Sequence, residues 1–301
     1  MPYAWLNGNW IEDSAAAISI RDSGFLHAAG MFTTLRAKGG VPLFLDRHLS
    51  RLRDSGKHLS IPIPHEDDQL TAAVREVLAR NSLSEARLRI TVTRGVPEVE
   101  QQSLKPTALI TANALTAHPK ESYEHGITVL LLDEQKLNPY DLQAGHKTLD
   151  YLSRMAGLRS AAARSAGEAL WFNVHNYLQS GSISNVMIVK NDRILTPPTP
   201  NEIAEPTLQE RMPYPRSAVL PGITRGVVLE LARKNGIGVE LAAINVTQLL
   251  DADEVFLTNS IMGVMPVCRI ERSVIGDDRP GDLTVKLAEG YQLEIDSQLK
   301  P

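Results

Sequence analysis

The stretch His146-Lys147-Thr148-Leu149-Asp150-Tyr151 is the part of the sequence on which we expect the fold and its chemistry to depend. It follows a glycine-containing loop (142–145) and precedes apolar residues that recur at helical spacing, namely Leu152, Met155, Leu158 and Ala162. A lysine at a loop-to-helix junction can be desolvated in a cleft, where it loses its proton more readily and attacks carbonyl groups. Most lysines are solvated, so the interpretation of Lys147 as a catalytic residue depends on evidence from other segments.

The composition indicates an ordinary globular chain of two domains. The chain has 301 residues, 43% of them hydrophobic, and is too long for one small core. We expect an N-terminal α/β domain over 1–117, a linker over 118–126 and a barrel-like C-terminal domain over 127–301. The net charge of −4 gives no basic footprint for nucleic acid. One cysteine, no signal-peptide pattern and no long apolar run together predict a cytoplasmic protein without a membrane span.

Strand and helix patterns alternate along the chain, which predicts an α+β (mixed α/β) fold. We expect loops at 22–30, 95–102 and 197–215, the second of them over a site. The predicted strands are 3–6 and 10–11 (a hairpin), 18–20, 31–37, 41–45, 88–94, 107–115, 127–132, 168–173, 186–189, 193–195 and 254–258. The predicted helices are 47–58 with Asp46 as N-cap, 66–80, one after Lys147, 222–235 and 282–297.

Three segments have residue types that bind phosphate. Pro221-Gly222-Ile223-Thr224-Arg225 opens a helix, and such a turn presents unpaired N–H groups to an anion, although an ordinary helix entry capped by Thr224 has the same pattern. Arg51 lies on a predicted helix and suits bidentate phosphate binding, or else faces solvent beside other arginines. Residues 258–263 follow a strand with small hydroxyl residues and a glycine, which suits an anion or a plain loop.

Several common functional patterns are absent from the sequence. We find no GxGxxG, no P-loop, no nucleophile elbow and no metal-ligand spacing among the eight histidines, so we predict no metal site. Cys268 has apolar neighbours and is expected in the core.

Taken together, the blocks resemble the class IV (fold-type IV) pyridoxal-phosphate aminotransferases, which include branched-chain aminotransferases, D-amino acid aminotransferases and aminodeoxychorismate lyases. The resemblance covers almost the full length, and the order and spacing of the blocks carry it. The blocks are Asp22-Ser-Gly-Phe, His48-Leu-Ser-Arg-Leu, His146–Tyr151, Ser182-Ile-Ser-Asn-Val, Leu195-Thr-Pro, Leu220-Pro-Gly-Ile-Thr-Arg and Ala252-Asp-Glu-Val-Phe-Leu-Thr-Asn-Ser.

The resemblance implies pyridoxal 5'-phosphate as cofactor and two domains that close over it in a homodimer. Lys147 would hold the cofactor covalently and then move the substrate α-proton. The resemblance also implies that Arg51, Ser260 and the N–H groups of Ile223 and Thr224 bind the phosphate. Tyr151 would lie against the ring hydroxyl, if a gap of one residue is allowed. Substrate contacts are expected from Phe32, Thr34, Ser260 and Ile261, with Thr33 as a further candidate on the same strand.

The chain departs from the family at the residue that faces the cofactor's ring nitrogen. Relatives have a glutamate there, and this chain has Ser180, with Gln179 as a possible neutral substitute. A carboxylate holds a protonated ring nitrogen by charge, whereas a hydroxyl offers only a neutral hydrogen bond. We therefore expect a weaker electron sink, and each 1.4 kcal/mol lost there slows proton abstraction about tenfold.

The substrate signals of the family subgroups are incomplete. The Arg-x-His carboxylate trap of D-amino acid enzymes is absent from 95–102, and Tyr151 favours the branched-chain type. Our main hypothesis is an aminotransferase that exchanges an amino group between an amino acid, with the branched-chain type favoured, and a 2-oxo acid. The alternative is an aminodeoxychorismate lyase that releases pyruvate, which Ser180 and residues 261–268 favour. A third hypothesis is a non-catalytic relative that binds the cofactor.

Overall fold

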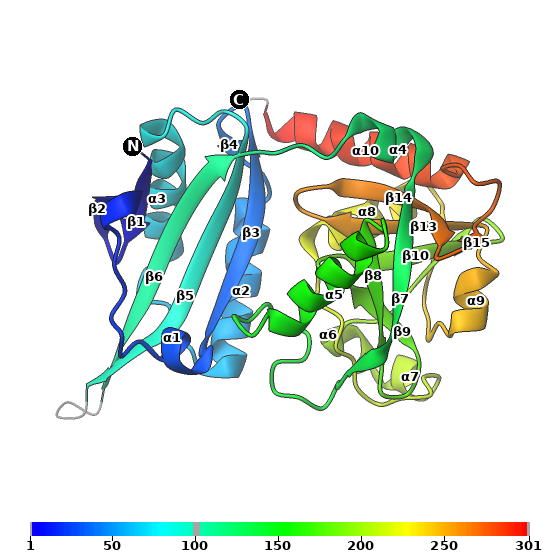
Figure 1. Cartoon of the computed structure of the whole chain (residues 1–301), viewed down its shortest axis with the longest axis horizontal. Helices are drawn as coiled ribbons and strands as arrows, with labels where there is room; N and C mark the ends of the chain where they lie inside the picture. Colours follow the sequence, from blue (N-terminus) through cyan, green and yellow to red (C-terminus); the bar gives the residue numbers. More distant parts are fainter. Residues whose placement is uncertain (1, 99–102, 300–301) are drawn as a thin grey trace. The chain divides into compact units, whose positions relative to one another are not determined.

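The computed structural model describes residues 2–98 and 103–299, which form two compact units (Figure 1). The first unit contains the chain up to Thr116, the short segment His146–Asp150 and the residues from Ile295 onward. The second unit contains residues 117–145 and Tyr151–Glu294. The segments at 146–150 and beyond 294 thus belong to the first unit, although the sequence-based ranges placed both in the C-terminal domain.

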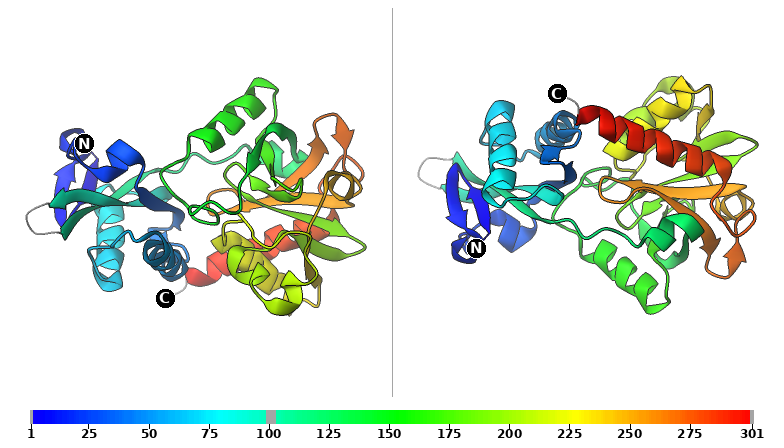
Figure 2. Two further views of the ribbon diagram at one scale, coloured as in Figure 1. Left: turned by 90° about the horizontal axis from the view of Figure 1, so that it is seen from below. Right: turned by 90° about the horizontal axis from the view of Figure 1, so that it is seen from above.

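The first unit is a six-stranded sheet with the order β2-β1-β6-β5-β3-β4. Helices α2 and α3 cover one face of it, as Figure 2 shows, and the core lies between them. Alternation along β3 sends Met31 and Leu35 into this core, where Leu49 and Leu52 of α2 meet them. The elements are β1 (Tyr3–Leu6), β2 (Asn9–Glu12), η1 (Asp13–Ala15), α1 (Ser23–His27), β3 (Gly30–Lys38), β4 (Val41–Pro42), α2 (Leu45–Leu59), α3 (Asp67–Arg80), β5 (Ala86–Glu98) and β6 (Ser103–Ala114).

The second unit is a nine-stranded mixed sheet with the order β12-β11-β10-β13-β14-β7-β8-β9, and β15 pairs with β14. Helix α5 packs on β7 and β8, and α8 packs on β12 and β13. Its strands are β7 (Ile127–Leu137), β8 (Glu168–Asn173), β9 (Leu178–Gly181), β10 (Asn185–Lys190), β11 (Arg193–Thr196), β12 (Gly238–Leu241), β13 (Glu254–Asn259), β14 (Gly263–Ile270) and β15 (Ser273–Val274). Its helices are α4 (Lys120–His125), α5 (Leu152–Ala163), α6 (Pro200–Ile203), α7 (Pro206–Gln209), α8 (Ile223–Lys234), α9 (Val246–Leu250) and α10 (Asp282–Gln298), whose last residues belong to the first unit.

The mixed α+β class predicted from the sequence is confirmed, and so is the N-terminal hairpin. Its turn has Asn7 and Gly8 both at positive φ, as a tight two-residue turn requires. Cys268 is buried, as its apolar neighbours predicted. Among the described residues, no helix combines the length and apolarity needed to cross a membrane.

Several predicted elements are wrong or incomplete. Residues 18–20 form no strand, and Ile20 is 79% exposed because no neighbouring strand pairs with it. Helix α2 begins after Phe44, which adopts a left-handed conformation, so Asp46 lies in the first turn and is not the N-cap. The expected loops at 22–30 and 197–215 contain α1, α6 and α7, and the expected linker contains α4. Residues 95–98 extend β5, and 99–102 lie outside the described residues.

Helix α5 was predicted correctly, but its buried face was not. Leu152 and Met155 are exposed, at 73% and 43% of their surface. The buried residues are Gly157 and Ala161, because small side chains let the helix lie close against the sheet. The side of α5 that carries Arg154 therefore becomes available for contacts inside this unit.

Candidate active site

The backbone around Lys147 is attached to strand β3 as a short extra strand. Phe32 N donates to Lys147 O at 2.9 Å, Leu149 N donates to Gly30 O at 3.0 Å, and Met31 and Thr148 form an antiparallel bridge. A side chain at Gly30 would begin 2.5 Å from the Leu149 side chain, so the close approach requires glycine. The lysine is thus held at a fixed position on the sheet of the first unit.

Two cationic side chains lie close to the aromatic ring of Phe32. Lys147 Nζ is 4.6 Å from the ring centroid, and Arg89 Cζ is 3.5 Å from it. Arg89 is on β5 directly opposite Thr34, so its side chain shares one face of the sheet with Phe32 and Thr34. Thr34 Oγ1 is buried and has no hydrogen-bond partner among the described residues. This face therefore offers positive charge, an aromatic surface and an unsatisfied hydroxyl.

The opposite face of β3 holds a second polar group, which includes Arg51. Arg51 Nη2 donates to Thr33 Oγ1 at 3.0 Å, and the same oxygen lies 2.6 Å from His48 Nδ1. Burial lowers the pKa of His48 well below its usual value, and the charges of Arg51 and Lys147 add to the effect. Thr33 therefore orients Arg51 and does not lie beside Phe32, which corrects the expectation that Thr33 faces the substrate together with Phe32 and Thr34.

His146 is held next to the lysine by two contacts within the first unit. Its Nδ1 lies 2.9 Å from Ser55 Oγ, and its ring stacks on that of His58 with centroids 4.5 Å apart. Burial, and then the neighbouring His58, lower the pKa of His146 to about 4. His146 is consequently neutral at physiological pH.

In the second unit, helix α8 begins without a side-chain cap. Its N-cap is Gly222, so the first-turn N–H groups of Ile223 and Thr224 lie at the positive end of the helix dipole. Thr224 is not the cap, because its hydroxyl lies 3.1 Å from Tyr291 Oη. Asn185 Nδ2 donates to Leu220 O at 2.9 Å and fixes the turn that leads into the helix.

Strand β13 ends beside this helix with another unsatisfied hydroxyl. Thr258 is directly opposite Asn185, so both side chains are on one face of the sheet. Thr258 Oγ1 is buried and has no partner within the described part of the chain. Beyond Thr258, the Asn259 side chain accepts from Ile261 N and Met262 N and fixes the loop that contains Ser260. Uncapped helix N–H groups and hydroxyls together suit an anion such as phosphate.

Ser180 is on β9 and receives a hydrogen bond from an arginine that the sequence did not single out. Arg154 Nη1 donates to Ser180 Oγ at 2.9 Å and to Gly181 O at 2.8 Å, and its guanidinium lies 5.1 Å from the Trp171 ring. Tyr151 is close by, with its hydroxyl 3.5 Å from Ser182 O. Gln179 is no substitute for Ser180, because alternation turns it to the other side of β9.

The Gln179 amide forms hydrogen bonds with backbone groups on that side of the strand. Its Oε1 accepts from Ala218 N at 3.0 Å, and its Nε2 donates to Leu178 O at 2.9 Å. The amide therefore organises the segment around Ala218.

A buried carboxylate supports the turn that follows Ser180. Glu168 accepts from Ser182 N at 3.0 Å, Ile183 N at 3.2 Å and Ser184 Oγ at 3.0 Å. Burial raises the pKa of Glu168, and these hydrogen bonds oppose the rise. Sequence reasoning placed Glu168 at the start of a strand and gave no signal for its partners, which come from the next hairpin.

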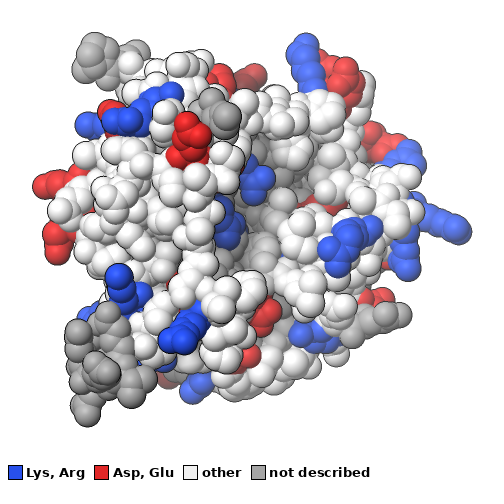
Figure 3. Space-filling view, turned by 60° about the vertical axis from the view of Figure 1, so that its left-hand side comes forward, with Lys and Arg blue, Asp and Glu red and all other residues white. Residues whose placement is uncertain are grey.

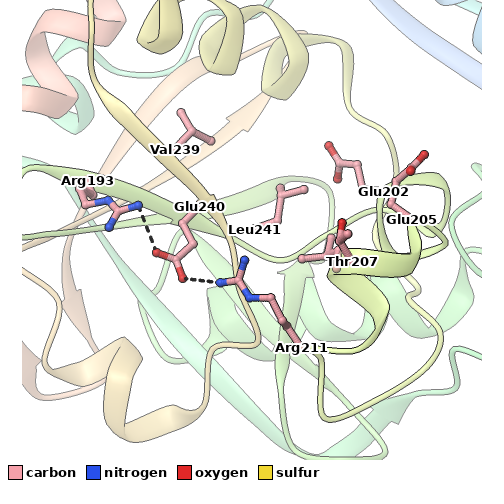
Figure 4. A pocket seen from close by; sticks show the side chains of 9 residues that line it. Arg193, Glu202, Glu205, Thr207, Arg211, Val239, Glu240 and Leu241 are labelled. Carbon is pink, nitrogen blue, oxygen red and sulfur yellow. Dashed lines mark ion pairs between the residues drawn. The ribbon is translucent and has the colours of Figure 1, made fainter.

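The remaining charged features are less suited to catalysis. Arg225 is buried and donates to both carboxylate oxygens of Glu202 and to Pro197 O, which closes the segment after β11. A groove of about 500 Å³, shown in Figure 4, contains Glu240 between Arg193 and Arg211, at 3.5 and 3.7 Å. None of the predicted site residues lines it. On the face in Figure 3, basic and acidic side chains are interspersed.

Comparison with known families gives the decisive observation. The family model described as amino-transferase class IV matches residues 30–270. The chain belongs to this family. The membership predicted from the sequence blocks is therefore confirmed, and with it the fold-type IV architecture.

Individual relatives extend over nearly the full length of the chain. It is 31% identical over 291 residues to a "Putative branched-chain-amino-acid aminotransferase" of Methanocaldococcus jannaschii, covering 96% of this chain and 94% of that protein. It is 26% identical to the aminodeoxychorismate lyase of Bacillus subtilis, covering 98% and 95%. Its fold resembles that of the solved branched-chain amino acid aminotransferase of Escherichia coli, with a TM-score of 0.86, 24% identity and coverage of 99% and 95%.

Proposed function

We propose that this class IV aminotransferase uses pyridoxal 5'-phosphate to exchange an amino group between an amino acid, branched-chain by preference, and a 2-oxo acid. The observation that carries the proposal is the position of Lys147. Its backbone is bonded to β3, and its amine lies over Phe32 in a cationic neighbourhood. The name of the Methanocaldococcus jannaschii relative supports the branched-chain preference.

The residues present fit the cofactor's functional groups. Lys147 supplies the amine that an aldehyde requires. The uncapped start of α8, at Ile223 and Thr224, suits the phosphate, as does the buried and unpaired Thr258 hydroxyl. The family resemblance adds Arg51, which Thr33 orients, together with Ser260 and Tyr151.

When bound, the cofactor supplies an electron-withdrawing ring that stabilises the negative charge left on the substrate's α-carbon. Lys147 acts first as the base that removes the substrate's α-proton and then as the acid that gives the proton back as the amino group is transferred. His48 and His146 are uncharged at neutral pH. The positive charge near Lys147 therefore comes from Arg51 and Arg89 and does not change with pH near neutrality.

The face that carries Phe32, Thr34 and Arg89 suits an amino acid. We propose that the guanidinium of Arg89 attracts its carboxylate, since arginine binds carboxylates bidentately. The Phe32 ring provides apolar surface for an aliphatic side chain, and the family resemblance adds Ile261. Arg89 was missed from the sequence, because only the register of β3 with β5 shows that it lies beside Phe32.

The test is an absorbance titration of the purified protein with pyridoxal phosphate. L-glutamate, L-leucine, L-isoleucine and D-alanine are then added one at a time. Wild-type protein should show the spectrum of a lysine-bound cofactor, and one donor should convert it to the pyridoxamine form. Lys147→Ala should abolish the lysine-bound spectrum, whereas Lys57→Ala, at an exposed lysine of α2, should not. An unchanged spectrum in the Lys147 variant would exclude the assignment.

A second candidate is the lyase reaction that releases pyruvate from aminodeoxychorismate. The Bacillus subtilis relative and the neutral Ser180 favour it. The two reactions differ in their need for a second substrate. Pyruvate that forms without any 2-oxo acid acceptor identifies the lyase, and turnover only with an acceptor identifies the aminotransferase.

We propose further that the protein acts as a cytoplasmic homodimer. Phe25 and Leu26 of α1 and the nearby Ile20 expose 73%, 54% and 79% of their surface. Large apolar side chains clustered on one segment are typical of an interaction surface. Sedimentation that gives a mass of about 33 kDa at assay concentration would exclude the dimer.

A further inference from the structure

The family pattern has a negative charge at the residue that faces the cofactor's ring nitrogen, and this chain has a positive charge next to it. Ser180 is in the glutamate's place, and Arg154 Nη1 lies 2.9 Å from its hydroxyl oxygen. The second bond of Arg154, to Gly181 O at 2.8 Å, holds the guanidinium against the same strand. Two bonds to adjacent residues make this a fixed arrangement.

The charge of Arg154 has little compensation nearby. The fields of Tyr151 and Glu168 reach it, while the Glu168 carboxylate accepts its hydrogen bonds from Ser182, Ile183 and Ser184 and not from Arg154. Among the ion pairs of residues 2–98 and 103–299, none joins Arg154 to a carboxylate. The guanidinium therefore acts on Ser180 as a cation whose field is only partly cancelled.

The hydrogen bond also fixes the direction of the Ser180 hydroxyl. A guanidinium can only donate, so Ser180 Oγ accepts from Arg154 and its own proton points to another acceptor. A neutral pyridine nitrogen is such an acceptor. A protonated one is a donor with a positive charge, which the nearby guanidinium repels.

We propose that Arg154, acting through Ser180, keeps the ring nitrogen of the bound cofactor unprotonated, which makes Arg154 a positioning residue for the reaction. The inference rests on the proposed function, because it requires the pyridine cofactor to be bound. It reverses the family's usual arrangement, in which a carboxylate keeps that nitrogen protonated. The ring then withdraws electrons less strongly, which lowers the rate at which Lys147 removes the α-proton.

The test is nitrogen NMR of the holoenzyme loaded with pyridoxal phosphate that carries ¹⁵N in its ring. The ¹⁵N chemical shift distinguishes a protonated from an unprotonated pyridine nitrogen and needs no turnover. Wild type should show the unprotonated nitrogen at neutral pH. Arg154→Gln removes the charge, and should raise the ring-nitrogen pKa by roughly one to three units, the usual effect of a nearby charge.

Three further variants separate the charge from the fold. Arg154→Lys retains the charge and should remain close to wild type. Arg159→Gln, at an exposed arginine of the same helix, should leave the shift unchanged. Ser180→Glu places a carboxylate beside Arg154 and should yield the protonated nitrogen, so the proposal stays testable if Arg154→Gln fails to fold.

Two results would overturn the inference. One is a protonated ring nitrogen in wild type, and the other is the same ring-nitrogen pKa in wild type, Arg154→Gln and Ser180→Glu. Failure of the proposed function gives a different result, because the protein would then show no cofactor bound to Lys147 and no ring signal. The two failures are therefore distinguished before any variant is compared.

Discussion

Replacing Gly222 by alanine should disrupt the start of α8. The new Cβ would lie 1.9 Å from Asn185 Oδ1 and 3.1 Å from Asn185 Cγ. The backbone of Gly222 has an ordinary extended conformation, with φ of −68°, so backbone strain does not contribute. The Asn185 side chain is buried and must move to relieve the overlap.

The size of the effect follows from the bond that Asn185 makes. Movement of its amide breaks the 2.9 Å bond from Nδ2 to Leu220 O and leaves a buried polar group unsatisfied. This costs about 2–4 kcal/mol of unfolding free energy, from the lost bond and the desolvation penalty together. Gly226 is the matched control, because a Cβ there meets nothing within 4 Å, and alanine in a helix interior gains up to about 1 kcal/mol.

Urea unfolding of both variants measures the difference in unfolding free energy, which we expect to be about 2–5 kcal/mol in favour of Gly226→Ala. Equilibrium binding of pyridoxal and of pyridoxal phosphate gives a second readout. If the start of α8 binds the phosphate, Gly222→Ala should lose affinity for the phosphorylated form alone. Equal stability of the two variants would refute the steric argument, and an unchanged preference for the phosphorylated form would refute the assignment of the phosphate site.

Two further predictions concern ionisable side chains that are wholly or partly buried. The folded-state pKa of His146, about 4, lies below its usual value of 6.5, so the unfolded chain binds the proton more tightly and unfolding free energy is lost as pH falls through this window. Because His146 is only partly buried, we expect a loss of about 1–2 kcal/mol of unfolding free energy between pH 6.5 and pH 4. Urea unfolding across that range should show a smaller slope for His146→Asn, and an unchanged slope would contradict the prediction. Arg225→Met should lower stability by about 2–4 kcal/mol, because it leaves the partly buried Glu202 without its partner. Thermal unfolding checks this prediction against Arg193→Met, because the Arg193 side chain is 57% exposed and its loss should cost no more than about 1 kcal/mol. Equal losses of stability in the two variants would show that burial is not the cause.

Features with a local signal were predicted well from the sequence. Asn7-Gly8 specifies a turn in any context, and Gly222 marks the start of α8 because helices favour few residue types as N-caps. The junction before α5 was also predicted, with Lys147 ahead of the helix. These are properties of a few consecutive residues, and the rest of the fold changes them little.

Features that depend on register were not predictable in this way. Arg89 gains its significance from the pairing of β3 with β5, and Glu168 from the turn that it supports. Arg154 was missed because periodicity assigned the large apolar residues of α5 to the core, whereas Gly157 and Ala161 make the contact. A close-packed interface of small residues has almost no hydrophobic signal, so the sequence points to the wrong side of the helix.

The first unit is assembled from three separate parts of the chain, which has a consequence for its biosynthesis. Its sheet up to Thr116 leaves the ribosome early, but the final partners of Lys38 and Phe44 are Asp296 and Gln298. At 5–20 residues per second, the roughly 180 intervening residues take about 10–35 s to synthesise. During that interval the nascent sheet lacks its C-terminal contacts, whereas the Lys147 segment follows Thr116 by only about 30 residues and is made early in it. The reactive lysine can therefore take its place beside β3 once about half of the polypeptide has been made, well before the C-terminal residues complete the unit.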